Sequence, residues 1–303
     1  MITLSTCQFP TSSSIPSNYE HMRSLIIEAG RNKADAAHFC ECALSGYVGA
    51  DIKNISEIDW DVLLKYSEKL RELAKENNIW IIFGSTHRLG KNKPLNSLYV
   101  IDANGNLADR YDKRFCAGDI DGKYGDLAHY SSGNDFVTFV INDVKFGLQI
   151  CHDYRYPEMY REYQQLGVHV MLHSYHATFA DKSAIEENAA NMGSTTWSNS
   201  TLTYPGITMP ATMISYAANN YMWISCPNSG AYESCWGSFV VRPDGIIESQ
   251  LKRGDTGMIV TEINHAKKYY DSTKAWRDRS ISKNYHSGAE LVHEDRIVAK
   301  SSF

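Results

Sequence analysis

The stretch VKFGLQICHDYRYPEMYREYQQLG, residues 144–167, decides the fold. Val144–Ile150 is an apolar run of strand length, and Pro157 suits the first position of a helix, where its missing N–H leaves no hydrogen bond unmade. Gly167 favours the left-handed conformation that commonly ends a helix, and Val168–Leu172 is a second apolar run. We therefore predict a strand, a sharp turn, a helix and a second strand in a βαβ-like unit.

Cys151 lies at this sharp turn. A turn between a strand and a helix lifts a side chain out of the sheet edge, and the nearby helix N-terminus favours a thiolate. A single cysteine is otherwise often a small buried hydrophobe. His152 follows directly, but consecutive side chains at such a turn point apart. We therefore expect the backbone N–H of His152, and not its ring, to assist chemistry at Cys151.

A thiol that attacks an amide needs a base to take its proton and donors to hold the oxyanion. Two charged residues lie at positions where they could act as this base or as such a donor. Glu41 follows the apolar run Ala36–Cys40, and Lys113 follows a polar stretch. A single charged residue in such a place is usually a solvated surface residue. These two residues alone therefore do not define a site.

Apolar runs and helical periodicity predict the remaining elements. Amphipathic helices are expected over Tyr19–Ala29 and Asp61–Asn77. Further strands are expected over Ile2–Gln8, Ala36–Cys40, Ile79–Gly84, Leu98–Asp102, Tyr221–Cys226, Gly237–Val241 and Gly257–Ile263, with a strand pair within Phe136–Ile150. Tight turns are expected at Asn104-Gly105, at Asn142-Asp143 and at residues 242–245. Strands alternate with helices at first and later pair through turns, which favours a layered α/β fold with mixed sheets.

The composition is that of an ordinary globular protein of 303 residues, with 43% hydrophobic residues and a formal net charge of -5. The slight acidity argues against nucleic acid or an anionic membrane as a partner. No apolar run is long enough for a transmembrane helix, and the first residues lack the features of a signal peptide. Seven cysteines at irregular spacings argue against a disulfide framework and favour the reducing cytoplasm. Cys40 and Cys42 lack the second pair that a zinc site needs.

Two segments stand apart by composition. Thr178–Pro210 is rich in Ser, Thr, Asn and Ala, which fits either a surface loop with some helix or a lid over a pocket. Residues 264–303 are polar and of mixed charge, with scattered aromatic residues. We expect this tail to pack on the preceding domain or on a neighbouring subunit.

Three stretches together resemble the carbon–nitrogen hydrolase (nitrilase) superfamily. They are ECALSGY at residues 41–47, YDKRFCAGD at 111–119 and LQICHDYRYPEMYRE at 148–162. They follow one another in that family's order of glutamate, lysine and cysteine. The stretches at residues 96–105 and 236–245 are similar as well, so the likeness covers roughly residues 2–263.

The resemblance implies a four-layer αββα sandwich with two mixed β-sheets, formed by a domain of residues 1–263 with an extension of residues 264–303. It implies that Glu41 is the general base, Cys151 the nucleophile and Lys113 the cation that stabilises the oxyanion, together with the backbone N–H of His152. The family often has a second acidic residue seven positions before a glycine. Counted back from Gly133, this residue would be Asp126, whose side chain is one methylene shorter than the family's usual glutamate. The resemblance implies no metal or organic cofactor, and it implies a homodimer or higher homo-oligomer.

The same resemblance places other residues near the substrate. Tyr47, Tyr175 and His176 are expected to line the pocket, and Arg155 either contacts a substrate carboxylate or braces the start of the helix. His173 and His176 could bind a metal only if they were helical and had a third ligand, so a metal site is not predicted.

The predicted function is hydrolysis of a small amide through a thioester on Cys151, which releases ammonia or an amine and a carboxylic acid. True nitrilases tend to carry Trp-Glu directly after the cysteine, whereas this chain has His-Asp, which is closer to the amidase and carbamoylase branches. N-carbamoyl amines and nitriles stay open as alternative substrates. A non-catalytic binding or scaffold relative is the alternative of a different class. A papain-type peptidase is disfavoured because its local signature is missing.

Overall fold

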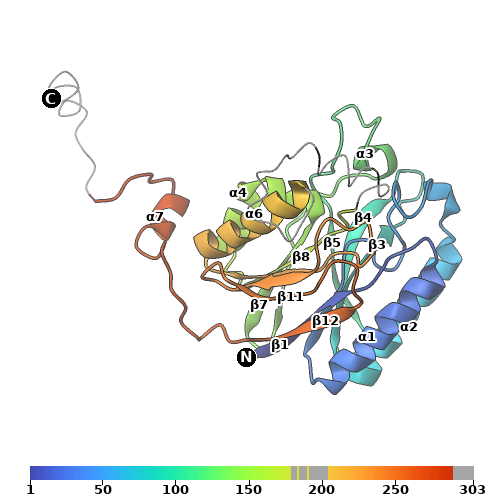
Figure 1. Ribbon diagram of the computed structural model, residues 1–303, viewed down its shortest axis with the longest axis horizontal. Helices are drawn as coiled ribbons and strands as arrows, with labels where there is room; N and C mark the ends of the chain where they lie inside the picture. The colour runs from blue at the N-terminus through green and yellow to red at the C-terminus, as the bar shows by residue number, and fades with distance from the viewer. Residues whose placement is uncertain (179–182, 184–189, 191–203, 289–303) are drawn as a thin grey trace.

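The computed structural model describes residues 1–178, 183, 190 and 204–288, and its centre is a pair of six-stranded sheets (Figure 1). In spatial order the first sheet contains β12 (Gly257–Ile263), β1 (Ile2–Gln8), β2 (Ala36–His38), β3 (Trp80–His87), β4 (Leu95–Ile101) and β5 (Leu107–Asp112). The second contains β11 (Ile247–Gln250), β10 (Phe239–Val241), β9 (Trp223–Cys226), β8 (Val170–Ser174), β7 (Val144–Ile150) and β6 (Thr138–Ile141). The central strands pair in parallel and the outer ones antiparallel, which confirms the prediction of mixed sheets.

Helices cover the outer face of each sheet (Figure 1). The first sheet is covered by α1 (Ile15–Arg31) and α2 (Trp60–Asn77), and the second by α4 (Pro157–Gln165) and α6 (Tyr204–Asn220). Buried side chains form three layers, one between the two sheets and one under each pair of helices. The αββα sandwich is therefore confirmed. Shorter helical turns are found at Ile55–Glu57, α3 (Asp126–His129), η2 (Cys151–Arg155) and α7 (Arg277–Ile281).

The two amphipathic helices of the first half are confirmed with small changes at their ends. α1 begins at Ile15, before the predicted Tyr19, because the side chain of Ser14 accepts a hydrogen bond from the Ser17 N–H and caps the helix. α2 is capped by the Asp59 side chain, and Asn78, which follows its last residue, has a left-handed backbone.

Besides the short helical turns, three elements were missed by the sequence analysis. β5 and β11 are edge strands with largely polar, exposed residues, so they lack the alternation of a half-buried strand. α6 begins at Tyr204, within Thr178–Pro210, and it contains Pro210, a typical helix breaker, in its interior. Most of this segment, residues 179–182, 184–189 and 191–203, lies outside the described residues, so the choice between a surface loop and a lid stays untested.

The segment after β12 contributes no strand among its described residues, 264–288. Tyr269 contacts the body of the protein, since its ring packs edge-on against Trp223 and its N–H donates to the Tyr221 hydroxyl over 2.9 Å. α7 lies at the margin of the molecule (Figure 1). Within the described ranges, the structure contains no helix with the length and apolar character that crossing a bilayer requires.

Candidate active site

Cys151 is the first residue of η2 and follows β7 directly, in a strained turn, and α4 begins at Pro157 as predicted. Its φ of 42° lies in the left-handed region that non-glycine residues rarely adopt. Asp153 holds this turn, because its carboxylate accepts hydrogen bonds from the Ile150 N–H (3.0 Å), the Phe115 N–H (2.8 Å) and the Tyr111 hydroxyl (2.7 Å). The cysteine turn is thereby tied to the chain segment that carries Lys113.

Glu41 lies just beyond the end of β2, and its side chain is fully buried. Its Oε1 accepts hydrogen bonds from the Lys113 ammonium over 2.8 Å and from the Asn96 side chain over 2.7 Å. Its Oε2 accepts from the backbone N–H of His176 over 2.9 Å. Elements from both sheets therefore fix the position of this carboxylate.

Lys113 lies between two carboxylates. In addition to Glu41, its Nζ contacts Asp126 Oδ2 over 2.7 Å, and all three side chains are almost completely buried. Asp126 also accepts hydrogen bonds from the Ala117 N–H over 2.7 Å and from the Tyr47 hydroxyl. Burial by itself would lower the pKa of Lys113, but the two carboxylates outweigh it and raise this pKa well above its usual range. Lys113 is therefore a permanent cation.

Cys151 lies beside this charged cluster and is only partly buried. Burial and the Glu41 carboxylate raise the pKa of its thiol well above the usual range, although Lys113 opposes the shift, and the thiol is hydrogen-bonded to Glu41. The expectation of a stabilised thiolate was therefore wrong. The reason is that a carboxylate faces the sulfur, while the turn that follows is a short 3-10 helix with a weak dipole. The arrangement suits a neutral thiol that transfers its proton to Glu41 during attack.

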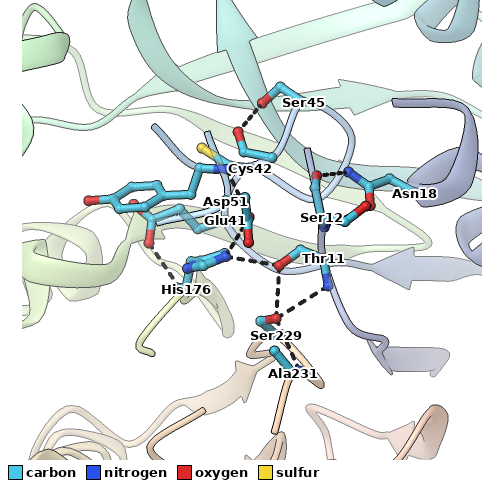
Figure 2. A network of polar contacts seen from close by, with 12 residues as sticks. Thr11, Ser12, Asn18, Glu41, Cys42, Ser45, Asp51, His176, Ser229 and Ala231 are labelled. Carbon is cyan, nitrogen blue, oxygen red and sulfur yellow. Dashed lines mark hydrogen bonds and ion pairs between the residues drawn. The ribbon is translucent and has the colours of Figure 1, made fainter. Parts of the chain in front are cut away.

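His176 belongs to a second polar network, which Figure 2 shows beside Glu41. Its Nε2 lies 2.8 Å from Asp51 Oδ2 and 2.9 Å from the Thr11 hydroxyl, which in turn lies 2.8 Å from the Ser229 hydroxyl. The imidazole stacks on the Tyr47 ring with centroids 5.0 Å apart. Burial would lower the pKa of His176, yet the Asp51 carboxylate produces a net upward shift.

The Asp51–His176 pair predicts a pH-dependent stability. The pKa of His176 is raised in the folded state. Its contribution to the unfolding free energy is therefore complete at a pH below the ordinary pKa of about 6.5, and it is lost as the pH rises through the folded-state pKa. Burial would raise the pKa of Asp51, but His176 and the Tyr47 N–H lower this pKa overall. The contribution of Asp51 to the unfolding free energy is therefore complete at a pH above its ordinary pKa of 3.8, and it is lost at lower pH. We expect Asp51→Asn to lower the unfolding free energy by about 1–3 kcal/mol at pH 5.5, and by less above pH 8, in urea titrations.

Asp121→Asn is the matched control, because this carboxylate is exposed and lies 3.8 Å from the exposed Lys123 ammonium. Its effect should stay within about 0.5 kcal/mol at every pH. A loss in Asp51→Asn that is equal at pH 5.5 and pH 9 would contradict a charged pair.

The remaining predicted residues lie around the cysteine turn in different settings. His152 is half-buried, and burial followed by Lys113 and Arg155 lowers its pKa. Arg155 is exposed, with its guanidinium 4.6 Å from the centre of the Tyr154 ring. The Tyr175 side chain packs in the layer under α4 and α6, where its hydroxyl donates to the sulfur of Met213. Its carbonyl oxygen accepts a hydrogen bond from the Glu41 N–H over 3.2 Å.

The sequence analysis did not single out Asn96, which contacts Glu41 directly. Asn96 is a fully buried asparagine within β4, and its Oδ1 also accepts a hydrogen bond from the Cys42 thiol. Asparagine is disfavoured inside strands, and a buried amide needs partners. An asparagine that opens the apolar run at residues 96–101 was therefore a usable signal of a polar neighbour.

Gly84 in β3 allows the Glu41 segment to lie directly on the sheet. A Cβ at this position would overlap with the backbone of Cys40, Glu41 and Cys42. We therefore expect Gly84→Ala to displace Glu41, to reduce catalytic activity and to lower the unfolding free energy by about 1–3 kcal/mol. Gly257→Ala is the control, because a Cβ there would meet only a distant Leu251 side chain. Full activity of Gly84→Ala would show that the Glu41 segment does not need this close approach.

His173 and His176 have separate partners. His173 lies 2.8 Å from the Tyr160 hydroxyl and 3.1 Å from the carbonyl oxygen of Cys151, whereas His176 binds Asp51 and Thr11. In the part of the chain that the structure describes, no group of three or more His, Cys, Asp or Glu residues is arranged to hold a metal ion.

Residues 3–269 match the carbon-nitrogen hydrolase family. The chain is 31% identical to the omega-amidase of Homo sapiens over 173 residues, which cover 56% of this chain and 62% of that protein. It is 26% identical to the 2-oxoglutaramate amidase of Bacillus subtilis (strain 168) over 169 residues, with the same shares covered. A nitrilase and fragile histidine triad fusion protein of Caenorhabditis elegans is 26% identical over 163 residues, which cover 52% of this chain and 37% of that protein. The chain therefore matches less than two thirds of the length of these relatives.

The fold is similar to that of an amidase from Nesterenkonia AN1. The TM-score is 0.71 at 17% sequence identity, with 94% of this chain and 97% of the amidase covered. A cysteine-to-alanine variant of that amidase has been solved in complex with butyramide. Another variant shows acrylamide added to the active-site cysteine.

Proposed function

Because this chain belongs to the carbon-nitrogen hydrolase family, we propose that it hydrolyses the C–N bond of a small amide through a thioester on Cys151. The observation that carries the proposal is the buried Lys113 ammonium, which lies 2.8 Å from Glu41 and 2.7 Å from Asp126 at the base of the cysteine turn. Burying three charges is costly unless function or excellent pairing compensates. A non-catalytic scaffold would have no need of this cluster beside a partly exposed thiol.

In the first half of the proposed reaction, the Cys151 sulfur attacks the amide carbon as its proton passes to Glu41. The two carboxylates occupy two of the three N–H donors of Lys113, which leaves the third for the oxyanion. The backbone N–H of His152 is proposed as the second oxyanion donor. When the intermediate collapses, the C–N bond breaks and Glu41 gives its proton to the leaving nitrogen.

In the second half, a water molecule attacks the thioester and gives a proton to Glu41. The second tetrahedral intermediate then breaks its C–S bond, and the proton on Glu41 returns to the sulfur. The products are a carboxylic acid and ammonia or an amine. Asn96 and the His176 N–H are positioning groups in this scheme, since they hold the Glu41 carboxylate that moves each proton.

Simple linear amides are the preferred substrate class. The relatives named amidases support this choice, as does the butyramide complex of the Nesterenkonia protein. N-carbamoyl amines and nitriles are the alternatives. We further propose a homo-oligomer, which sedimentation velocity would measure, and a reducing compartment such as the cytoplasm, because all seven cysteines are free thiols.

A panel of linear amides, ω-amides, nitriles and ureides, assayed side by side for ammonia release, tests the substrate class. We expect turnover of amides, and a mass increase equal to one acyl group on a peptide that contains Cys151 after rapid quenching. Release of ammonia from ureides alone would replace the amide proposal with carbamoylase activity. No turnover of any class, with Cys151 unmodified, would contradict an enzymatic function.

A further inference from the structure

A cavity of about 390 Å³ lies on the outer face of the first sheet, against α2 and the strands β3, β4 and β5. α1 packs over β12 and β2, and α2 over β3. Strands are spaced by about 4.8 Å and helices by about 10 Å, so two helices cover about four of six strands. The cavity lies where the helical cover ends. Glu41, Lys113 and Cys151 are not among its lining residues.

The cavity has apolar and aromatic walls. Phe83 and Tyr99 line it with stacked rings whose centroids are 5.3 Å apart, and Trp60 lines it from the start of α2. Leu64 and Leu107 also line it and are largely exposed to solvent, at 62% and 53%. The volume is within the usual range for ligand pockets. Together with the flat aromatic walls, it favours a small ring system as the occupant.

Ser85 supplies the observation that points to a ligand. This residue lines the cavity at 1% exposure, and its hydroxyl has no hydrogen-bond partner among the described residues. A buried hydroxyl without a partner is unfavourable, because it has lost its water and gained nothing in exchange. A bound molecule with an acceptor group would satisfy it.

Tyr99 offers a second donor. The Arg110 guanidinium can only donate, so His87 Nε2, 2.8 Å away, accepts, and Nδ1 carries the ring proton. His87 Nδ1 then donates to the Tyr99 hydroxyl oxygen over 2.7 Å, which leaves the hydroxyl hydrogen of Tyr99 without an acceptor in this chain of contacts. Burial raises the pKa of Tyr99 to about 12, so the hydroxyl stays protonated at neutral pH.

One cation at the cavity, Arg88, favours an anionic ligand. Arg71 pairs with Glu68 over 2.9 Å, and Arg110 pairs with Asp112 over 2.9 Å. Arg88 is exposed, with its guanidinium 5.5 Å from the centre of the Trp60 ring, and it forms no ion pair with the described residues. Asp61 also lines the cavity, so the three arginines are matched in number by three carboxylates, and Arg88 is the arginine among them without an ion pair in the described part of the chain. A carboxylate could therefore bind Arg88 while a ring occupies the apolar walls.

We propose that this cavity is a second binding site, separate from the active site, for a small aromatic carboxylate. The ring lies against Phe83, Tyr99 and Trp60, and the carboxylate accepts hydrogen bonds from Ser85 and Tyr99 and faces Arg88. The proposal stands independently of the hydrolase reaction, because it uses none of the catalytic residues.

Isothermal titration calorimetry of the full chain with 3-phenylpropionate tests the site. We expect saturable one-to-one binding that Ser85→Ala weakens by about tenfold, because a hydrogen bond to a charged group is lost. The same variant should raise the melting temperature of the free protein, since it removes an unpartnered hydroxyl. A merely structural serine would not give these opposite effects.

The neutral analogue 3-phenylpropanol separates the ring from the charge. It should bind wild type about tenfold more weakly than 3-phenylpropionate, and Arg88→Gln should reduce this preference. Absence of saturable binding overturns the proposal. A second contrary result would be binding that is changed by Glu41→Gln but not by Ser85→Ala or Arg88→Gln, because the ligand would then occupy the active site. A dimer that Leu64→Lys dissociates would also overturn it, since the cavity would then be a subunit contact.

Discussion

Replacement of Cys151 by alanine is expected to abolish ammonia release from small amides, with a loss of at least about 10,000-fold in kcat, because nucleophile and base act as one unit. The variant should fold normally, since the thiol is only partly buried and a smaller side chain leaves the Asp153 hydrogen bonds of the turn intact. Ammonia release and the urea unfolding midpoint are the two measurements.

Cys116→Ala is the matched control for this experiment. Cys116 is the other partly exposed cysteine, it lies on the segment after Lys113, and burial followed by Asp126 raises the pKa of its thiol to about 12. We expect this variant to keep its activity. Iodoacetamide should inactivate wild type and Cys116→Ala alike, with the label on Cys151. Full activity in Cys151→Ala would remove the thioester mechanism.

Replacement of Lys113 by methionine is expected to lower the unfolding free energy by about 3–5 kcal/mol at pH 7, because it leaves Glu41 and Asp126 buried without their cation. Activity should be lost as well, since the proposed oxyanion donor is gone. Lys123→Met is the control, because that ammonium is exposed and lies 3.8 Å from an exposed carboxylate. Its effect should be below about 1 kcal/mol.

A double variant separates charge from packing in this cluster. Adding Asp126→Asn to Lys113→Met removes one of the two unpaired carboxylates, so part of the lost stability should return, although activity should not. The measurement is urea unfolding of the two single variants and the double variant. Additive losses in the double variant would show that Asp126 and Lys113 do not stabilise each other through charge.

The fold of the middle of the chain could be predicted in detail because local signals there agree with the tertiary structure. Val144–Ile150, Pro157 and Gly167 mark the strand and helix around Cys151, and Asn142-Asp143 forms the tight turn before them with positive φ at both residues. Apolar runs of strand length are visible in a sequence because both faces of these strands are buried. The edge strands β5 and β11 and the helix α6 were not predicted, because their residues do not show such an apolar pattern.

The sequence by itself determined the mixed α/β fold, the turn at Cys151 and the three residue types on which the proposed amide hydrolysis depends. Only the tertiary structure decided which groups face each other. It placed Asn96 and the His176 N–H on Glu41, and it made the Cys151 thiol a neutral group instead of a thiolate. The physical reason is that a pKa and a hydrogen-bond partner depend on distances between segments far apart in the chain, which local periodicity does not contain.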